Sequence, residues 1–208
     1  MTIIKGTIEA KVVKLNAPES IKYIQGKEAL GIIGGEFAIT RDADELPITT
    51  LLGSCVAVMV YDSILKVNWM NHFLLPMSQS AGASNRFGLN AMETMLNEMY
   101  KMGCRKENLS AKITGGATIL RDLSDNIGER NVMFARSFCR SEGIRVISEH
   151  VLGDSGRVVM VDSDFRTIVR AITNRTMDEK LAQTERVLAA NVQKQETKVV
   201  HDTDITLF

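Results

Sequence analysis

The sequence predicts an α+β fold in which a mixed or antiparallel β-sandwich core is flanked by helices. Strand-like and helix-like segments alternate irregularly along the chain, so hairpins are expected beside crossovers, which argues against a doubly wound parallel sheet. Hydrophobic residues make up 45% of the 208 residues and charged residues 24%. This balance is typical of a globular protein with a sizeable core, so we expect one main domain with tails.

Composition along the chain divides it into three parts. Residues 1–33 mix short β-like runs and form an N-terminal extension, whereas residues 34–172 carry the regular pattern of the main domain. Residues 173–208 form a C-terminal helix and tail. The helix is expected over residues 176–195, because Thr176 and Glu179 form a capping box and apolar residues recur on one face. We expect this helix at the periphery and the final residues 201–208 as an exposed tail.

Strands are expected where β-branched and apolar residues cluster between turn residues. The first two, residues 55–61 and 67–75, are followed by Asp62-Ser63 and Pro76 and should be neighbours. Further strands are expected at residues 111–119, which include the pair Gly115-Gly116, and at residues 145–152, 156–161 and 166–172.

Two helices are expected inside the main domain. In residues 84–102, methionines recur at spacings of three and four, and we interpret this stripe as a core face rather than a partner-binding surface. The second helix is expected over residues 131–142, with Asn131 as its cap and Gly143 as its stop.

Charge and cysteine usage exclude several classes of function. Twenty-five basic residues balance twenty-five acidic ones, so no global field favours nucleic acid or an anionic membrane. The three cysteines are widely separated and contain no CxxC pair, which indicates neither a disulfide framework nor a zinc cluster. The first residues lack the apolar run of a signal peptide, and no uncharged stretch is suited to span a bilayer. We therefore expect a cytoplasmic protein without membrane insertion.

The candidate chemistry lies around Cys55, which follows Gly53 and Ser54. A cysteine is a useful nucleophile only as the thiolate, which a neighbouring imidazole or a ring of backbone N–H groups can stabilise. The Gly-Ser pair allows a sharp turn, so N–H groups near Cys55 could form an oxyanion hole. Of the three histidines, His72 lies in the adjacent strand-like segment and is the candidate base. The residues alone leave open the alternative that Cys55 and His72 are two buried structural residues.

Several segments resemble, in order and approximate spacing, the CheD family of chemoreceptor glutamine deamidases. They are TTLLGSCVAVMVYD, MNHFLLP, RFGLNAMETMLNEMYKMGC, AKITGGATI, IGERN and GRVV, and the resemblance runs from about residue 34 to residue 172. It implies that Cys55 is the nucleophile, that His72 is the base, and that Thr49 orients the imidazole, with the adjacent Thr50 as the alternative. Residues expected to support the oxyanion site are Gly53, Ser54, Asn71, Gly115 and Gly116.

The resemblance also implies a reaction and partners. The thiolate would attack the carboxamide of a glutamine in the cytoplasmic domain of a methyl-accepting chemotaxis receptor, and water would hydrolyse the thioester to leave glutamate. The same machinery could in principle cleave a glutamyl methyl ester. Neither metal nor organic cofactor is expected, and many family members bind a CheC-type phosphatase. Two alternatives stay open: an adaptor that binds receptor or phosphatase with little catalysis, and a cysteine hydrolase for a small amide.

Overall fold

The computed structural model describes residues 11–14, 28–41, 46–74, 86–119, 127–173 and 175–202. Its helices are α1 (Arg86–Lys101), α2 (Ile127–Ser141) and α3 (Arg175–Asp202), with a short 3-10 turn at Lys106–Asn108. Its strands are β1 (Lys11–Lys14), β2 (Glu28–Gly31), β3 (Phe37–Thr40), β4 (Ile48–Leu52), β5 (Val56–Asp62), β6 (Val67–Asn71), β7 (Leu109–Gly115), β8 (Arg145–Val151), β9 (Arg157–Val161) and β10 (Thr167–Ala171).

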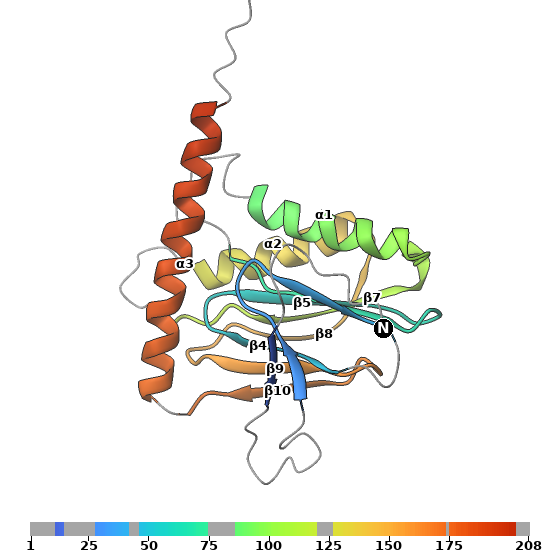
Figure 1. Cartoon of the computed structure of the whole chain (residues 1–208), viewed down its shortest axis with the longest axis horizontal. Helices are drawn as coiled ribbons and strands as arrows, with labels where there is room; N and C mark the ends of the chain where they lie inside the picture. The colour runs from blue at the N-terminus through green and yellow to red at the C-terminus, as the bar shows by residue number, and fades with distance from the viewer. Residues whose placement is uncertain are drawn as a thin grey trace, which may run out of the picture.

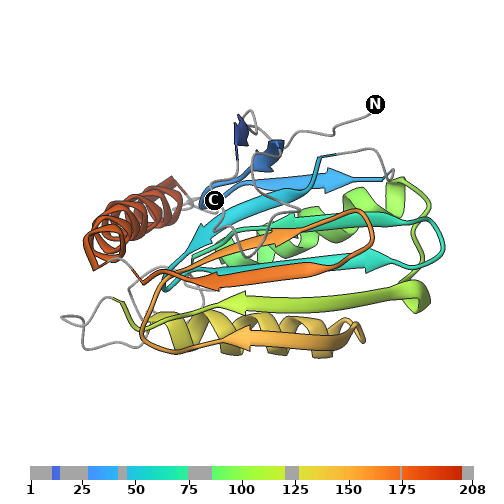
Figure 2. The same ribbon diagram turned by 90° about the horizontal axis from the view of Figure 1, so that it is seen from below.

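Within the described residues, these strands form two five-stranded sheets. Sheet A has the order β1-β2-β4-β9-β10, and sheet B has the order β3-β6-β5-β7-β8. Both are mixed, because β2 runs parallel to β4 and β7 runs parallel to β8, while the other neighbours are antiparallel. The sheets stack on each other, and α1 and α2 cover the outer face of sheet B (Figures 1 and 2). The predicted α+β sandwich with flanking helices is confirmed.

Strand β5 shows why the central strands are continuously apolar. Ala57 and Met59 belong to the cluster between the two sheets, whereas Val56, Val58 and Val60 belong to the cluster beneath the helices. Successive side chains point to opposite faces of a strand, so a strand buried on both faces carries apolar residues at every position. Sheet B is therefore the middle layer of the molecule, and Cys55 precedes its central strand.

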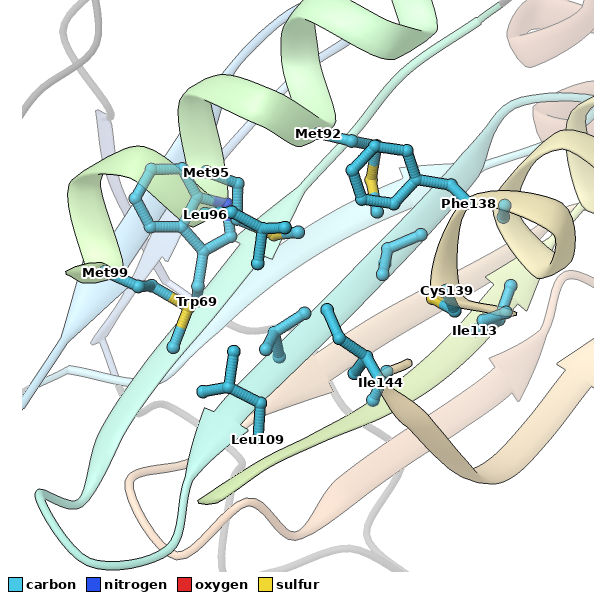
Figure 3. Packing of buried hydrophobic residues seen from close by; sticks show 14 of the residues in the cluster. Trp69, Met92, Met95, Leu96, Met99, Leu109, Ile113, Phe138, Cys139 and Ile144 are labelled. Atoms are coloured by element: carbon cyan, nitrogen blue, oxygen red, sulfur yellow. The ribbon is translucent and has the colours of Figure 1, made fainter. Parts of the chain in front are cut away.

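The methionine stripe of α1 packs into the core, as predicted. Met92, Met95 and Met99 are fully buried against sheet B (Figure 3). Cys104 and Cys139 lie in the same cluster, where burial raises the pKa of each thiol to about 11. Such thiols stay protonated near neutral pH, so both cysteines are structural residues.

Several boundaries differ from the prediction because long-range contacts set them. The strand expected over residues 111–119 is β7, which begins at Leu109 and ends at Gly115. Helix α2 begins at Ile127 rather than Asn131, so Asn131 lies inside the helix and does not cap it. The first turn of α2 lies against the backbone of Gly116, and a β-carbon at Gly128 would meet the Gly116 carbonyl group. The predicted strand over residues 67–75 is β6, which ends at Asn71 and continues only as an isolated bridge between Val56 and Phe73.

The segments outside the main domain contribute more than expected. β1 and β2 lie in the predicted N-terminal extension, yet they extend sheet A. Helix α3 is present as predicted and lies at one end of the sandwich (Figures 1 and 2), but Leu181 and Glu185 are buried rather than peripheral. The predicted tail lies almost wholly outside the described residues. In the part of the chain that the structure describes, every helix is too short or too polar to pass through a lipid bilayer.

Candidate active site

Residues Gly53 to Cys55 connect β4 in sheet A to β5 in sheet B, and their three carbonyl groups all have donors. The Gly53 carbonyl accepts a hydrogen bond from the backbone N–H of Ala117 at 2.7 Å. The Ser54 carbonyl accepts one from the amide of Asn131 at 2.7 Å, and the Cys55 carbonyl accepts one from the backbone N–H of Gly116 at 2.7 Å. In a planar trans peptide the N–H points away from the carbonyl group. Holding the carbonyl groups of Gly53 and Ser54 therefore also fixes the direction of the N–H groups of Ser54 and Cys55.

The glycine pair supports this connection from behind. Gly115 has a φ of 113° and Gly116 a φ of 71°, in the left-handed region that favours glycine. A β-carbon at Gly115 would collide with the Cys55 carbonyl oxygen, and one at Gly116 would collide with Val132 and the backbone of Gly128. The predicted support by this pair therefore takes the form of close backbone packing rather than contact with a substrate.

The backbone N–H groups of residues 53–55 converge on one side chain, the carboxylate of Glu185 in α3. Gly53 donates to Oε1 at 2.8 Å and Cys55 donates to the same oxygen at 3.2 Å. Ser54 donates to Oε2 through its backbone N–H and its hydroxyl, each at 2.6 Å. We call this set of donors on Gly53, Ser54 and Cys55 the N–H cradle. It has the composition of an oxyanion hole, as the Gly-Ser-Cys segment predicts.

The sequence reasoning did not find Glu185. The residue is 2% exposed and lies between Leu181 and Leu188 on the apolar face of α3. The sequence does contain one indication of its role, since Glu185 lies on an otherwise apolar face of the helix. A carboxylate that is buried with such a face needs hydrogen-bond donors around it.

His72 follows β6, and its ring is oriented by Thr50 in β4. The distance between Thr50 Oγ1 and His72 Nδ1 is 2.8 Å, and the same hydroxyl donates its hydrogen to the Ile32 carbonyl at 2.7 Å. A hydroxyl has only one hydrogen to donate, so Oγ1 must accept from Nδ1–H. In the neutral ring Nε2 is then unprotonated, and it has no hydrogen-bond partner among the described residues. The imidazole thus presents a free lone pair, as a general base requires.

The orienting contact that the resemblance assigned to Thr49 is made by Thr50. The Thr49 hydroxyl instead donates to the Val159 carbonyl in β9 at 2.8 Å. Consecutive residues of β4 point to opposite faces of sheet A, so only one of the two threonines can reach His72.

Asn71 does not join the site. Its Oδ1 accepts a hydrogen bond from the Val58 N–H at 3.0 Å, and its Nδ2 lies 3.1 Å from Met92 Sδ. The side chain therefore ties β6 to β5 and to α1 in the helix-covered layer. Its predicted role in supporting the oxyanion site is replaced by this structural one, because Asn71 and His72 point in opposite directions.

Cys55, His72 and Glu185 are close together and buried. A ring nitrogen of His72, Sγ of Cys55 and a carboxylate oxygen of Glu185 all lie within 4.8 Å of one another. Burial raises the pKa of the Cys55 thiol well above its ordinary value, and the negative charge of Glu185 raises it further. Burial also lowers the pKa of His72 to about 4, against the smaller opposite effect of Glu185. In this arrangement the site holds a neutral thiol and a neutral imidazole.

A thiol, an imidazole and a carboxylate are also a ligand set that zinc accepts. Both oxygens of Glu185 already accept hydrogen bonds from the N–H cradle, so the carboxylate would have to leave these donors to bind an ion. The expectation that the chemistry needs no cofactor stays a prediction.

A cysteine and a histidine beside convergent backbone N–H groups, at the junction of two stacked sheets, are the arrangement found in cysteine-dependent acyl-transfer sites. A family model described as CheD chemotactic sensory transduction matches residues 74–170. The chain is 45% identical over 130 residues to the probable chemoreceptor glutamine deamidase CheD of Rhizobium meliloti, covering 61% of this chain and 70% of that one. It is 37% identical over 186 residues to the probable chemoreceptor glutamine deamidase CheD 1 of a Ruegeria species, covering 88% of this chain and 97% of that one. The chain belongs to the CheD family, which confirms the resemblance.

Among solved structures, the hypothetical protein YfiH of Bacillus licheniformis is similar with a TM-score of 0.38 and 15% identity, over 54% of this chain and 48% of that one.

Proposed function

We propose that this protein is a protein-glutamine deamidase that converts specific glutamines in the cytoplasmic domains of chemoreceptors to glutamate. One observation carries the proposal. The N–H cradle beside Cys55 and His72 holds the carboxylate of a glutamate side chain, which is the group that glutamine deamidation leaves. The relatives named as chemoreceptor glutamine deamidases support the choice of substrate.

In the first half of the reaction, His72 Nε2 takes the thiol proton of Cys55, and the thiolate attacks the carboxamide carbon of the substrate glutamine. The carbonyl oxygen becomes an oxyanion and is held by the N–H cradle, whose donors need no reorganisation. The tetrahedral intermediate then collapses, the carbon–nitrogen bond breaks, and His72 returns the proton to the departing ammonia. A thioester between Cys55 and the substrate remains.

In the second half, His72 Nε2 removes a proton from water as the water oxygen attacks the thioester carbon. The carbon–sulfur bond breaks, Cys55 recovers its proton from His72, and the substrate leaves as glutamate. Thr50 keeps Nδ1 protonated throughout, so Nε2 is always the nitrogen that transfers the proton. A glutamyl methyl ester would pass through the same thioester with methanol as the leaving group.

A cytoplasmic location follows from the proposed receptor substrate, and a CheC-type phosphatase remains a predicted partner. The adaptor and the small-amide hydrolase are the competing functions. An adaptor would bind a receptor domain without changing its mass, and a small-amide hydrolase would act on free amides but leave receptor glutamines intact.

The test is mass spectrometry of a purified receptor cytoplasmic domain after incubation with this protein. Deamidation adds about 1 Da at each modified glutamine, and Cys55→Ala should abolish the change because no thioester can form. Cys104→Ala is the matched control, since Cys104 is a buried cysteine outside the site. Equal modification by Cys55→Ala and the unmodified protein would refute the assignment, provided that thermal unfolding shows that both variants are folded.

A further inference from the structure

We propose that α3 is an intramolecular product mimic, which covers the surface where the glutamine-bearing segment of the substrate docks and places Glu185 where the product carboxylate lies. This inference rests on the proposed function and adds a regulatory contact within the chain. In the state described here, the enzyme is closed by its own helix, and α3 must move away before a substrate can bind.

The first support is the set of hydrogen bonds to Glu185. Both carboxylate oxygens are held, one by the N–H groups of Gly53 and Cys55 and the other by the N–H and hydroxyl of Ser54. These donors are the ones that an oxyanion on a substrate carbon would use. A second molecule cannot use them while Glu185 is present, so substrate binding and α3 docking exclude each other.

The second support is the shape of the surface beneath α3. Three glycines from separate parts of the chain present bare backbone to this helix, and a β-carbon on any of them would collide with a side chain of α3. Gly156 lies against Leu181, Gly34 lies against Leu188, and Gly53 lies against Glu185 as well as Ile119 of the main domain. These α3 positions are three or four residues apart, so they form one stripe of the helix. The surface is therefore shaped to receive a helix that carries a glutamate or glutamine at its centre.

The start of the helix is held as well. The Asp178 carboxylate accepts a hydrogen bond from the backbone N–H of Gly156 at 2.8 Å, at the start of the helix. Other positions of α3 point to solvent, including Gln183 and Val187, which is 54% exposed. Helix α3 contributes no strand to either sheet, so it can detach without breaking strand pairs of the core, in the manner of other low-stability segments.

The closed state of the unmodified protein also cannot act on another molecule. Cys55 is 0% exposed, so another molecule cannot reach its thiol. His72 Nε2 has no hydrogen-bond partner among the described residues. The Glu185 charge beside Cys55 disfavours the thiolate. Departure of α3 would expose the thiol, remove this charge and empty the N–H cradle in one step.

A single substitution tests whether Glu185 lies in the product position. Glu185→Gln places a carboxamide in the N–H cradle beside Cys55, so the protein should deamidate itself: water is consumed, ammonia is released, and the side chain at position 185 becomes a carboxylate again. We expect the purified variant to gain about 1 Da at position 185, as read by peptide mass spectrometry. The same substitution combined with Cys55→Ala should keep its amide, and Gln183, which is exposed on the same helix, should stay unmodified in both.

A second measurement does not depend on deamidase activity. The rate at which iodoacetamide labels Cys55 should rise about tenfold or more in Glu185→Ala, because the variant removes both the charge and the side chain that holds α3 down. Gln183→Ala is the matched control and should label at the rate of the unmodified protein. The rate of receptor deamidation, as kcat/KM, should rise in Glu185→Ala and stay unchanged in the control.

The outcomes separate this inference from the proposed function. If receptor glutamines are deamidated but the amide at position 185 persists and Cys55 labelling does not change, the product-mimic inference is wrong and the function stands. Loss of receptor deamidation in Glu185→Ala would make Glu185 part of the catalytic machinery and would also overturn the inference. Faster labelling without any deamidation, at position 185 or in receptors, would retain α3 as a cover and refute the deamidase function.

Discussion

The buried imidazole of His72 makes the stability of the protein depend on pH in a calculable way. Its pKa is about 4 in the folded protein, against 6.5 for an ordinary histidine. Above pH 6.5 the ring is neutral in both states and contributes nothing to the dependence. As the pH falls from about 6.5 to about 4, the unfolded chain binds a proton that the folded protein does not, so the free energy of unfolding decreases.

The size of the decrease follows from the difference between the two pKa values. A difference of roughly 2.5 pH units corresponds to about 3.5 kcal/mol, at about 1.4 kcal/mol for each unit. Since the folded protein also begins to bind the proton near pH 4, about 2–3 kcal/mol of this should be lost by pH 4.5. This is a large share of the stability of an ordinary domain, which is about 5–15 kcal/mol.

Urea unfolding at pH 7.5, 5.5 and 4.5 measures the effect, with His72→Gln as the comparison because its side chain is polar and does not titrate. Other groups also titrate over this range, so the quantity of interest is the difference between the two pH profiles. We expect the unmodified protein to lose about 2–3 kcal/mol more than His72→Gln between pH 7.5 and 4.5. Parallel profiles would show that His72 is not held neutral in the folded protein, and a steeper loss in the variant would reverse the reasoning.

Four further predictions concern the surroundings of Cys55 and His72. Thr50→Val should lower kcat about ten- to a hundredfold in a deamidation assay, because the imidazole loses its orienting acceptor. Thr49→Val should keep kcat and lose about 1 kcal/mol of stability. The opposite ranking would return the orienting role to Thr49. Asn131→Ala leaves the Ser54 carbonyl without its donor. The variant should lose about 1–3 kcal/mol of stability in urea unfolding and have a lower kcat. Full activity would show that the N–H cradle does not need this support. Gly115→Ala should destabilise the protein far more than Gly103→Ala. Both glycines have positive φ, but only at Gly115 would a β-carbon collide with backbone atoms. Equal losses of stability would mean that the positive φ alone matters. EDTA should leave the deamidation rate unchanged, and a loss restored by added zinc would place a metal ion in the mechanism.

The sequence by itself determined the features that depend on local pattern. Apolar, β-branched runs bounded by turn residues predicted the central strands, and spacings of three and four predicted the buried methionines of α1. A cysteine after Gly-Ser and a histidine in the next strand-like segment predicted that Cys55 and His72 lie close together. These inferences succeed because the physical cause lies within a few residues: β-branched residues favour extended backbone, helix spacing follows from helical pitch, and turn formation follows from glycine.

Only the tertiary structure decided which neighbours complete the site. The choice between Thr49 and Thr50 depends on which face of β4 meets His72, and two consecutive threonines carry no pattern that reveals it. The start of α2 depends on its contact with Gly116, which no local pattern reveals. The sequence therefore predicts Asn131 as a helix cap, whereas in the structure its amide donates to the Ser54 carbonyl. Glu185 lies 130 residues beyond Cys55. It reaches the N–H cradle because α3 folds back across the glycines, and the docking of a distant helix is a property of packed surfaces that no local spacing encodes.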